Sequence, residues 1–120
     1  MVIEVERKDE ICIVRLKGRL VAGVDPELLR SKTEEIKKSN CTKVLVDFRE
    51  VSAVGSTGMG FIVGIYTSVT KVPEGRFVLV GAQPRVRDVL DLTRLSTVIP
   101  MAADMASGLA ELRGSIAARG

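Results

Sequence analysis

Two short, almost wholly apolar runs constrain the fold of this chain more than any other feature. They are residues 44–48 (VLVDF) and residues 76–80 (RFVLV). Runs of this kind are typical of strands that are covered on both faces, as in a parallel sheet. The segment between them, residues 58–69, is apolar around most of its circumference and is long enough to form a buried helix. Strand, helix and strand in this order predict a right-handed parallel crossover and an α/β fold.

The segments on either side of this unit continue the alternation of strands and helices. Residues 2–7 and 11–16 have the β-branched pattern of two strands, and the polar turn between them predicts a hairpin. Asp25 is a suitable N-cap and Pro26 a suitable first residue for the helix that follows. We expect helices over residues 25–38, 56–70, 84–93 and 104–113, and a brief final strand at residues 98–99.

Together these elements predict a single domain over residues 1–120. It belongs to the α/β class and has a mixed, roughly five-stranded sheet, an N-terminal hairpin and about four helices. Only the first strand is expected to run antiparallel to its neighbour, and residues 44–48 and 77–80 are expected to be central strands.

Composition and charge exclude several classes of function. The 18 basic and 15 acidic residues are scattered along the chain and leave a net charge of only +3, so no nucleic-acid partner is expected. No apolar stretch approaches the ~20 residues that span a bilayer, and no signal segment is apparent, so we expect a cytoplasmic protein without membrane insertion. Histidine is absent, which removes the commonest general base and the commonest metal ligand. We expect no metal, no cofactor and no enzymatic activity.

The two cysteines, Cys12 and Cys41, lie far apart in the sequence and form no CxxC motif. Disulfides are rare in cytoplasmic proteins, where thiols are kept reduced. We therefore predict two buried, reduced thiols.

Two hydroxyl groups stand where the central helix is expected to begin, within Gly55-Ser56-Thr57-Gly58. Unpaired N–H groups and the helix dipole favour negative charge at such a position. A phosphoryl group there would add ~1.5–2 negative charges to an exposed surface that a partner needs to be neutral, which makes a plausible switch. The simpler interpretation is structural, with Ser56 as an ordinary N-cap and the glycines, Gly58 and Gly60, allowing close packing.

Four stretches, in order and at the expected spacings, resemble the STAS family, which includes bacterial anti-sigma factor antagonists and the cytoplasmic domains of sulfate transporters. Residues 47–63 (DFREVSAVGSTGMGFIV) are similar to the family signature, an Asp-Leu-Ser-like strand end followed by Asp-Ser-Ser-Gly-Leu-Gly. The other stretches are residues 14–20 (VRLKGRL), 83–95 (QPRVRDVLDLTRL) and 104–112 (DMASGLAEL). The resemblance covers almost the whole chain and implies a STAS-like fold.

The resemblance also implies a function. In anti-sigma factor antagonists, the hydroxyl residue just before the glycine is phosphorylated by the anti-sigma factor, a serine kinase of the histidine-kinase-like ATPase type. That residue is Thr57 here, and stressosome-type relatives use the preceding position, Ser56. The unphosphorylated domain binds the kinase and frees the sigma factor, and a phosphatase is the second partner that such a cycle suggests. The predicted partner-binding residues are Leu20, Val21, Gly23, Asp25, Val54, Gly55, Ser56, Thr57, Gly58 and Met59.

The chain departs from the family pattern at two positions near the expected phosphorylation site. Gly55 stands where the family usually has an aspartate before the hydroxyl pair, and Val21 stands where many members have an aspartate after the Gly-x-Leu turn. Asp25 lies four residues further on and is better interpreted as a helix cap than as a substitute. A STAS domain that binds its partner without being phosphorylated is therefore an alternative.

The sequence also bears on three further classes of protein. A nucleotide-binding enzyme is disfavoured, because the glycines at positions 55, 58 and 60 have the wrong spacing and follow the third predicted strand. A phosphoacceptor receiver domain needs an acidic pair at the end of its first strand; here only Asp47 resembles an acceptor, and it is expected to be structural. A soluble STAS subunit of an ABC-type lipid transporter keeps the same fold and the same surface, so the sequence leaves it open.

Overall fold

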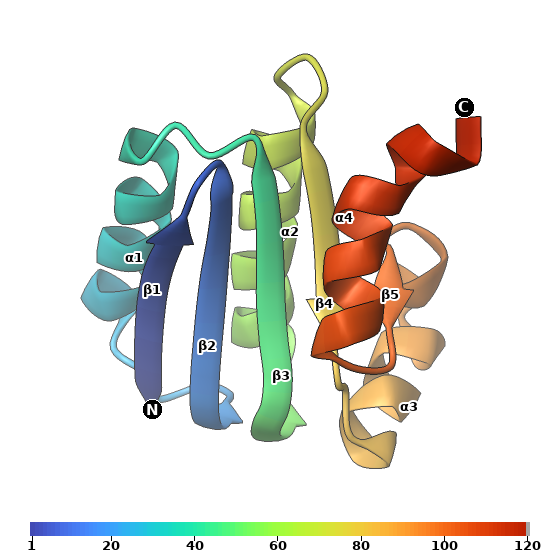
Figure 1. The fold of residues 1–120 in the computed structure, drawn as a ribbon. Coiled ribbons are helices and arrows are strands. Elements are labelled where there is room, and N and C mark those ends of the chain that lie inside the picture. The colour runs from blue at the N-terminus through green and yellow to red at the C-terminus, as the bar shows by residue number, and fades with distance from the viewer. Residues whose placement is uncertain (120) are drawn as a thin grey trace.

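The computed structural model describes residues 1–119, with side chains described as far as Arg113. Five strands and four helices alternate along the chain, with one short 3₁₀ turn (Figure 1). The strands are β1 (Val2–Lys8), β2 (Ile11–Leu20), β3 (Lys43–Val54), β4 (Arg76–Val80) and β5 (Met101–Ala102). The helices are α1 (Pro26–Lys38), α2 (Ser56–Thr70), α3 (Pro84–Leu92) and α4 (Met105–Arg119), and the 3₁₀ turn is Leu95–Thr97.

The strands form one sheet in the order β1-β2-β3-β4-β5. Only β1 is antiparallel to its neighbour, and every other neighbouring pair is parallel. The predictions of a mixed five-stranded sheet, an N-terminal hairpin and central strands at β3 and β4 are therefore confirmed. Within residues 1–119, no strand pairs with the outer side of β1, which forms a free edge of the sheet (Figure 1).

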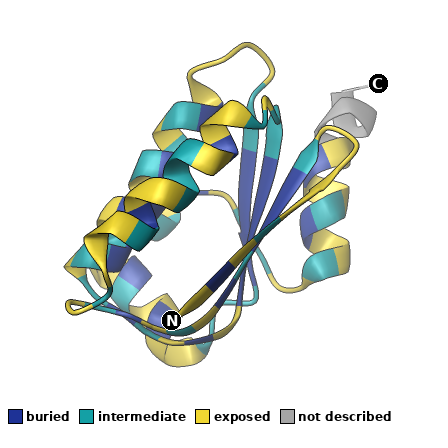
Figure 2. Ribbon diagram, turned by 90° about the vertical axis from the view of Figure 1, so that its left-hand side faces the viewer, coloured by how far each residue is buried: buried dark blue, intermediate teal, exposed yellow. Residues whose placement is uncertain are grey.

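Helices cover the two faces of the sheet unequally. Helices α1 and α2 lie on one face and α4 lies on the other, as the edge-on view in Figure 2 shows. The larger core fills the space beneath α1, α2 and α3, and its fully buried side chains include Val14, Val46, Phe48, Ile62 and Val86. A smaller core lies beneath α4 and consists of Ile13, Leu45, Val78, Val80 and Leu112. The strands β3 and β4 contribute to both cores, which explains why their sequences are continuously apolar.

Two strands extend further than the sequence predicted. Strand β2 continues through Gly18, which has a left-handed φ of 121°, and ends at Leu20. Strand β3 continues to Val54 instead of ending at Phe48. The pairing of β2 with β3 shifts register twice along this extension, so the residues do not alternate regularly between the faces and the pattern was not apparent from the sequence.

The prediction of a final strand at residues 98–99 was wrong. The amides of Val98 and Ile99 both donate to the Leu95 carbonyl oxygen, at 3.0 and 2.8 Å, so this apolar pair closes a helical turn. Ile99 is buried in the larger core. The chain pairs with β4 only afterwards, at Met101 and Ala102. The burial of Ile99 therefore comes from a turn, which the apolar pattern alone does not distinguish from a strand.

The prediction of two reduced thiols was also wrong, because Cys12 and Cys41 form a disulfide with a Cα–Cα distance of 5.9 Å. Cys12 lies on β2 opposite Val44 of β3, and Cys41 lies three residues before Val44, in the loop that leads into β3. The parallel register of these two strands brings the cysteines together. Their separation of 29 residues gave no local signal of the contact.

Candidate functional site

The two loops that the sequence singled out meet at the carboxyl ends of β2 and β3, at the bottom of Figure 1. The Gly55 amide donates a hydrogen bond to the Leu20 carbonyl oxygen at 2.9 Å, which fixes the β3–α2 loop to the β2–α1 loop. A methyl group placed on Gly55 would lie 3.7 Å from the Val21 Cα, an ordinary contact. The two positions at which this chain lacks the aspartates of the STAS pattern, Val21 and Gly55, are therefore neighbours. Both replacements remove negative charge from the same part of the surface.

Helix α2 begins at this junction with both candidate phosphoacceptors in its first turn. Gly55 is the N-cap, with an extended backbone (φ −122°) and no side-chain cap, so Ser56 is the first helical residue and the interpretation of Ser56 as N-cap was wrong. The first intrahelical bond runs from the Met59 amide to the Gly55 carbonyl oxygen at 2.9 Å. The amides of the three residues before Met59 have no partner within the helix, as at every helix start.

The two hydroxyl groups differ in exposure. Ser56 is exposed and Thr57 is half-buried. Neither hydroxyl forms a side-chain hydrogen bond with any described residue, whereas the Ser68 and Thr70 hydroxyls further along α2 bond to backbone carbonyl oxygens. The start of α2 therefore presents two unengaged hydroxyl groups where the backbone amides favour negative charge.

Three of the predicted partner-binding residues lie beneath this surface. Leu20, Val54 and Gly58 are buried. A methyl group on Gly58 would lie 2.5 Å from the Leu20 carbonyl oxygen and 2.7 Å from the Val54 Cγ2 atom, so only glycine allows α2 to pack this closely. These buried residues determine how closely the start of α2 packs against the two strands. The accessible residues of the predicted set are Val21, Gly23, Asp25, Gly55, Ser56, Thr57 and Met59.

The β2–α1 loop forms the second half of the surface. The Val24 amide donates to the Val21 carbonyl oxygen at 3.3 Å, closing a turn. Gly23 is exposed and has a left-handed φ of 102°, which a side chain would strain. The Asp25 carboxylate accepts from the Glu27 amide at 3.0 Å, which confirms Asp25 as the cap of α1.

A hollow of about 460 Å³ lies beside this loop. It is lined by Arg19, Ala22 and Val24, among others. Ala22 and Val24 lie within the segment 20–25 that the sequence identified, and Arg19 lies just before it. Arg19 was the one residue of the three that the sequence missed, and its position next to Leu20 was the available signal.

Asp47, the one candidate acceptor for receiver-type chemistry, is buried and fully engaged. Its Oδ1 atom accepts from the Arg49 amide and Nε at 3.0 Å each, and its Oδ2 atom accepts from the Arg49 Nη2 at 2.9 Å. Burial alone would raise the pKa of Asp47, but the hydrogen bonds and charge of Arg49 outweigh it and hold the pKa below its ordinary value. Asp47 is therefore a structural anion within β3, in line with the sequence-based expectation of a structural role.

Within the part of the chain that the structure describes, no three His, Cys, Asp or Glu side chains gather as a metal site would require. No described helix is both long enough and apolar enough to span a membrane.

These features define the class of the protein: a small α/β domain with one antiparallel edge strand and two hydrogen-bonded loops beside a hydroxyl-bearing helix start. The sequence profile of the STAS domain matches residues 2–108, and the chain belongs to the STAS domain family.

The chain is similar to known members along nearly its whole length. It is 26% identical over 110 residues to an anti-sigma F factor antagonist from Paenibacillus polymyxa, a match that covers 92% of this chain and 93% of that protein. The fold matches an anti-sigma factor antagonist from Mycobacterium paratuberculosis with a TM-score of 0.82, at 21% identity and 93% coverage of each chain. It also matches phosphorylated SpoIIAA from Bacillus with a TM-score of 0.64, at 24% identity, covering 86% of this chain and 93% of that one.

Proposed function

We propose that this protein is an anti-sigma factor antagonist that acts in the cytoplasm. Its partner is an anti-sigma factor with serine kinase activity of the histidine-kinase-like ATPase type, and binding this partner releases a sigma factor. The observation that carries the proposal is the joined surface of residues 20–25 and 54–59. There a hydrogen bond between Gly55 and Leu20 holds two loops together around the exposed start of α2. Loops held by a rigid sheet are well suited to docking a partner protein, and the relative from Paenibacillus polymyxa supports the assignment.

We further propose that phosphorylation of the first turn of α2 ends this complex, with Thr57 as the acceptor and Ser56 as the alternative. Both hydroxyls are unengaged within the described residues, and free amides of α2 are available to donate to phosphate oxygens. The phosphorylated form of SpoIIAA, a protein of the same fold, is consistent with such a switch. The added charge would enter a contact that must exclude water, which opposes binding.

Placing an arginine at Ser56 tests the docking surface. Ser56→Arg is expected to weaken binding of the purified anti-sigma factor by at least ~30-fold, because a bulky cation would occupy the centre of a closely packed contact. The measurement is isothermal titration calorimetry with the isolated kinase. Ser31→Arg is the matched control, because Ser31 is also an exposed serine in a helix but lies within α1, outside the two loops. Both variants should melt within a few degrees of the wild type.

An unchanged affinity for Ser56→Arg would contradict the proposed surface. A pull-down from the native cell identifies the partner independently. Recovery of an ABC-type ATPase in place of an anti-sigma factor would overturn the proposed function and support a transporter subunit.

A kinase assay tests the switch separately from binding. Thr57→Ala is expected to bind the partner and resist phosphorylation, whereas Thr57→Asp should bind at least ~30-fold more weakly, a loss of about 2 kcal/mol, because a charge enters a desolvated contact. The absence of an acid at Gly55 predicts slow phosphorylation of the wild type. Gly55→Asp should accelerate it, since its backbone (φ −122°) accepts a side chain and a Cβ there meets Val21 only at ordinary distances.

The readout is intact mass after incubation with kinase and ATP, with peptide mapping to separate Thr57 from Ser56. If neither the wild type nor Gly55→Asp gains a phosphate, the domain binds its partner without being switched at this site.

A further inference from the structure

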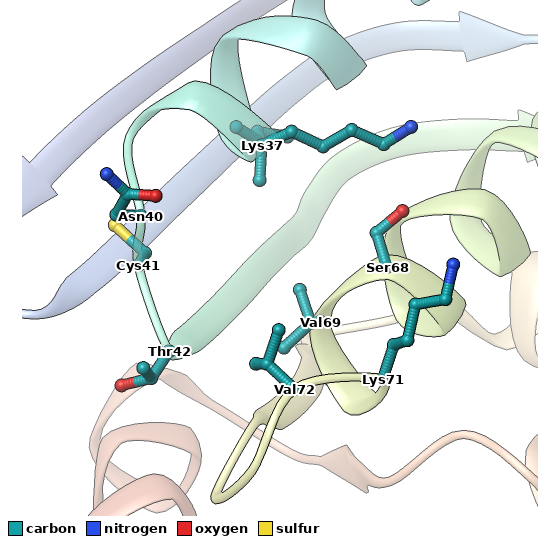
Figure 3. A pocket seen from close by; sticks show the side chains of 9 residues that line it. Lys37, Asn40, Cys41, Thr42, Ser68, Val69, Lys71 and Val72 are labelled. Carbon is teal, nitrogen blue, oxygen red and sulfur yellow. The ribbon is translucent and has the colours of Figure 1, made fainter.

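A cavity of about 520 Å³ lies at the end of the domain opposite the docking surface. It is formed by the C-terminal ends of α1 and α2 and by the loop that leads into β3 (Figure 3). Ile36, Val69 and Val72 give it an apolar wall, and Lys37, Lys71 and the disulfide-bonded Cys41 are among its other lining residues. Cavities that take small molecules commonly measure about 300–1,000 Å³.

The disulfide presents its two sulfur atoms unequally to this cavity. Cys41 is half-buried and lines the cavity, whereas Cys12 is fully buried in the larger core. Because Cys12 is fully buried, an incoming nucleophile can reach the disulfide only at Cys41, and Cys12 is the sulfur that would leave. The core already holds a partner for that released thiol, because the Cys12 Sγ atom lies 3.0 Å from the Ser39 Oγ atom. The Ser39 hydroxyl itself donates to the Ile36 carbonyl oxygen at 2.6 Å, which leaves its oxygen able to accept a bond from a Cys12 thiol.

The charges in the cavity favour a negatively charged molecule. Figure 3 shows the side chains of Lys37 and Lys71 extending along the side of the cavity away from Cys41. Lys37 is 3.9 Å from the exposed Glu34 carboxylate, and Lys71 forms no ion pair with any described side chain. A molecule that contacts both the lysines and the sulfur must extend across the cavity, so its carboxylates must lie well away from its own thiol, as in a short peptide.

We propose that Cys41 is a site of thiol–disulfide exchange with a carboxylate-bearing, peptide-sized low-molecular-weight thiol. The incoming thiolate attacks the Cys41 sulfur, the Cys12–Cys41 bond breaks, a mixed disulfide forms at Cys41, and Cys12 leaves as a thiolate that takes a proton from water. A second molecule of the same thiolate attacks the small molecule's own sulfur in the mixed disulfide, so the symmetrical small disulfide is released and Cys41 leaves as a thiolate that takes a proton from water. The reverse sequence, from that small disulfide, restores the Cys12–Cys41 bond. This exchange goes beyond the anti-sigma role and does not depend on it.

The test uses the full chain as Cys12→Ser, which keeps a hydroxyl beside Ser39 and traps any adduct on Cys41. The probes are oxidised glutathione, which carries carboxylates, and hydroxyethyl disulfide, which is uncharged. For each probe, the rate of Cys41 modification, measured by intact mass, is divided by the rate of the same probe with free cysteine. At low salt this ratio is expected to be on the order of tenfold larger for glutathione disulfide than for hydroxyethyl disulfide. Replacing both cavity lysines, Lys37→Gln with Lys71→Gln, should remove this advantage, and Lys38→Gln, outside the cavity lining, should retain it.

Equal relative rates for the two probes, or an advantage that survives loss of both lysines, would overturn the proposal. So would a Cys41 that stays unmodified in folded Cys12→Ser but reacts in urea. If Cys12→Ser fails to fold, reduced wild-type protein is exposed briefly to glutathione disulfide and peptide-mapped. The first adduct should then lie on Cys41, and an adduct that lies first on Cys12 contradicts the proposal.

Discussion

Reduction of the Cys12–Cys41 disulfide is expected to lower the free energy of unfolding by about 3–4 kcal/mol. The bond joins residues 29 positions apart, and opening it returns to the unfolded chain the conformational freedom that the closed loop removes. For a domain of this size, the loss corresponds to a fall in melting temperature of roughly 10–20 °C. The measurement is urea denaturation at neutral pH with and without dithiothreitol, with free thiols counted at the end.

The variant Cys41→Ser is the control for this effect. Its stability should match that of the reduced wild type to within ~1 kcal/mol and should not respond to dithiothreitol. A wild-type protein with two free thiols and an unchanged unfolding curve would show that the bond contributes nothing to stability.

The second large effect is on stability, which the same substitution, glycine to alanine, is expected to change in opposite directions at two positions of α2. Gly58→Ala is expected to destabilise the domain by about 1–3 kcal/mol, because the new methyl group would lie 2.5 Å from the Leu20 carbonyl oxygen. Gly60→Ala is expected to stabilise it by about 0.4–1 kcal/mol, because no atom lies within 4 Å of the new methyl group and alanine is the better helix former.

Chemical denaturation of the two variants in parallel measures this difference. Since both changes add one methyl group to α2, a general effect of alanine on the helix would move both curves in the same direction. That outcome would contradict the close packing of Gly58 against Leu20 and Val54.

The fold was predictable because the sequence of each main helix and strand contains both its apolar pattern and the residues that mark its ends. The helix bounds 56–70 were predicted as the structure has them, and the strand predicted at residues 77–80 begins one residue earlier, at Arg76. Each of these segments combines apolar burial with clear ends. The cap at Asp25 was predictable for the same reason, because capping requires only neighbouring residues. The short strand β5 could not be placed, because two residues carry no periodicity and the burial of Ile99 mimics a strand.

The candidate site was predictable as a set of segments but not as an arrangement. The sequence identified residues 20–25 and 54–59 through their family resemblance, and it could not show that Gly55 lies beside Val21 and bonds to Leu20. That contact depends on the register between β2 and β3, which shifts twice before the strands end. The Cys12–Cys41 bond depends on the same pairing at the opposite end of these strands, which is why it too was missed.

The free edge of β1 has a consequence for self-association. If a second copy paired antiparallel along this edge with its Val5 opposite Val5, Glu4 of each copy would lie opposite Glu6 of the other. Like charges directly opposite one another destabilise paired strands, and charged edge strands are a common protection against aggregation. In this register the charges of β1 oppose edge-to-edge pairing, which helps the sheet to end at β1 without a covering strand.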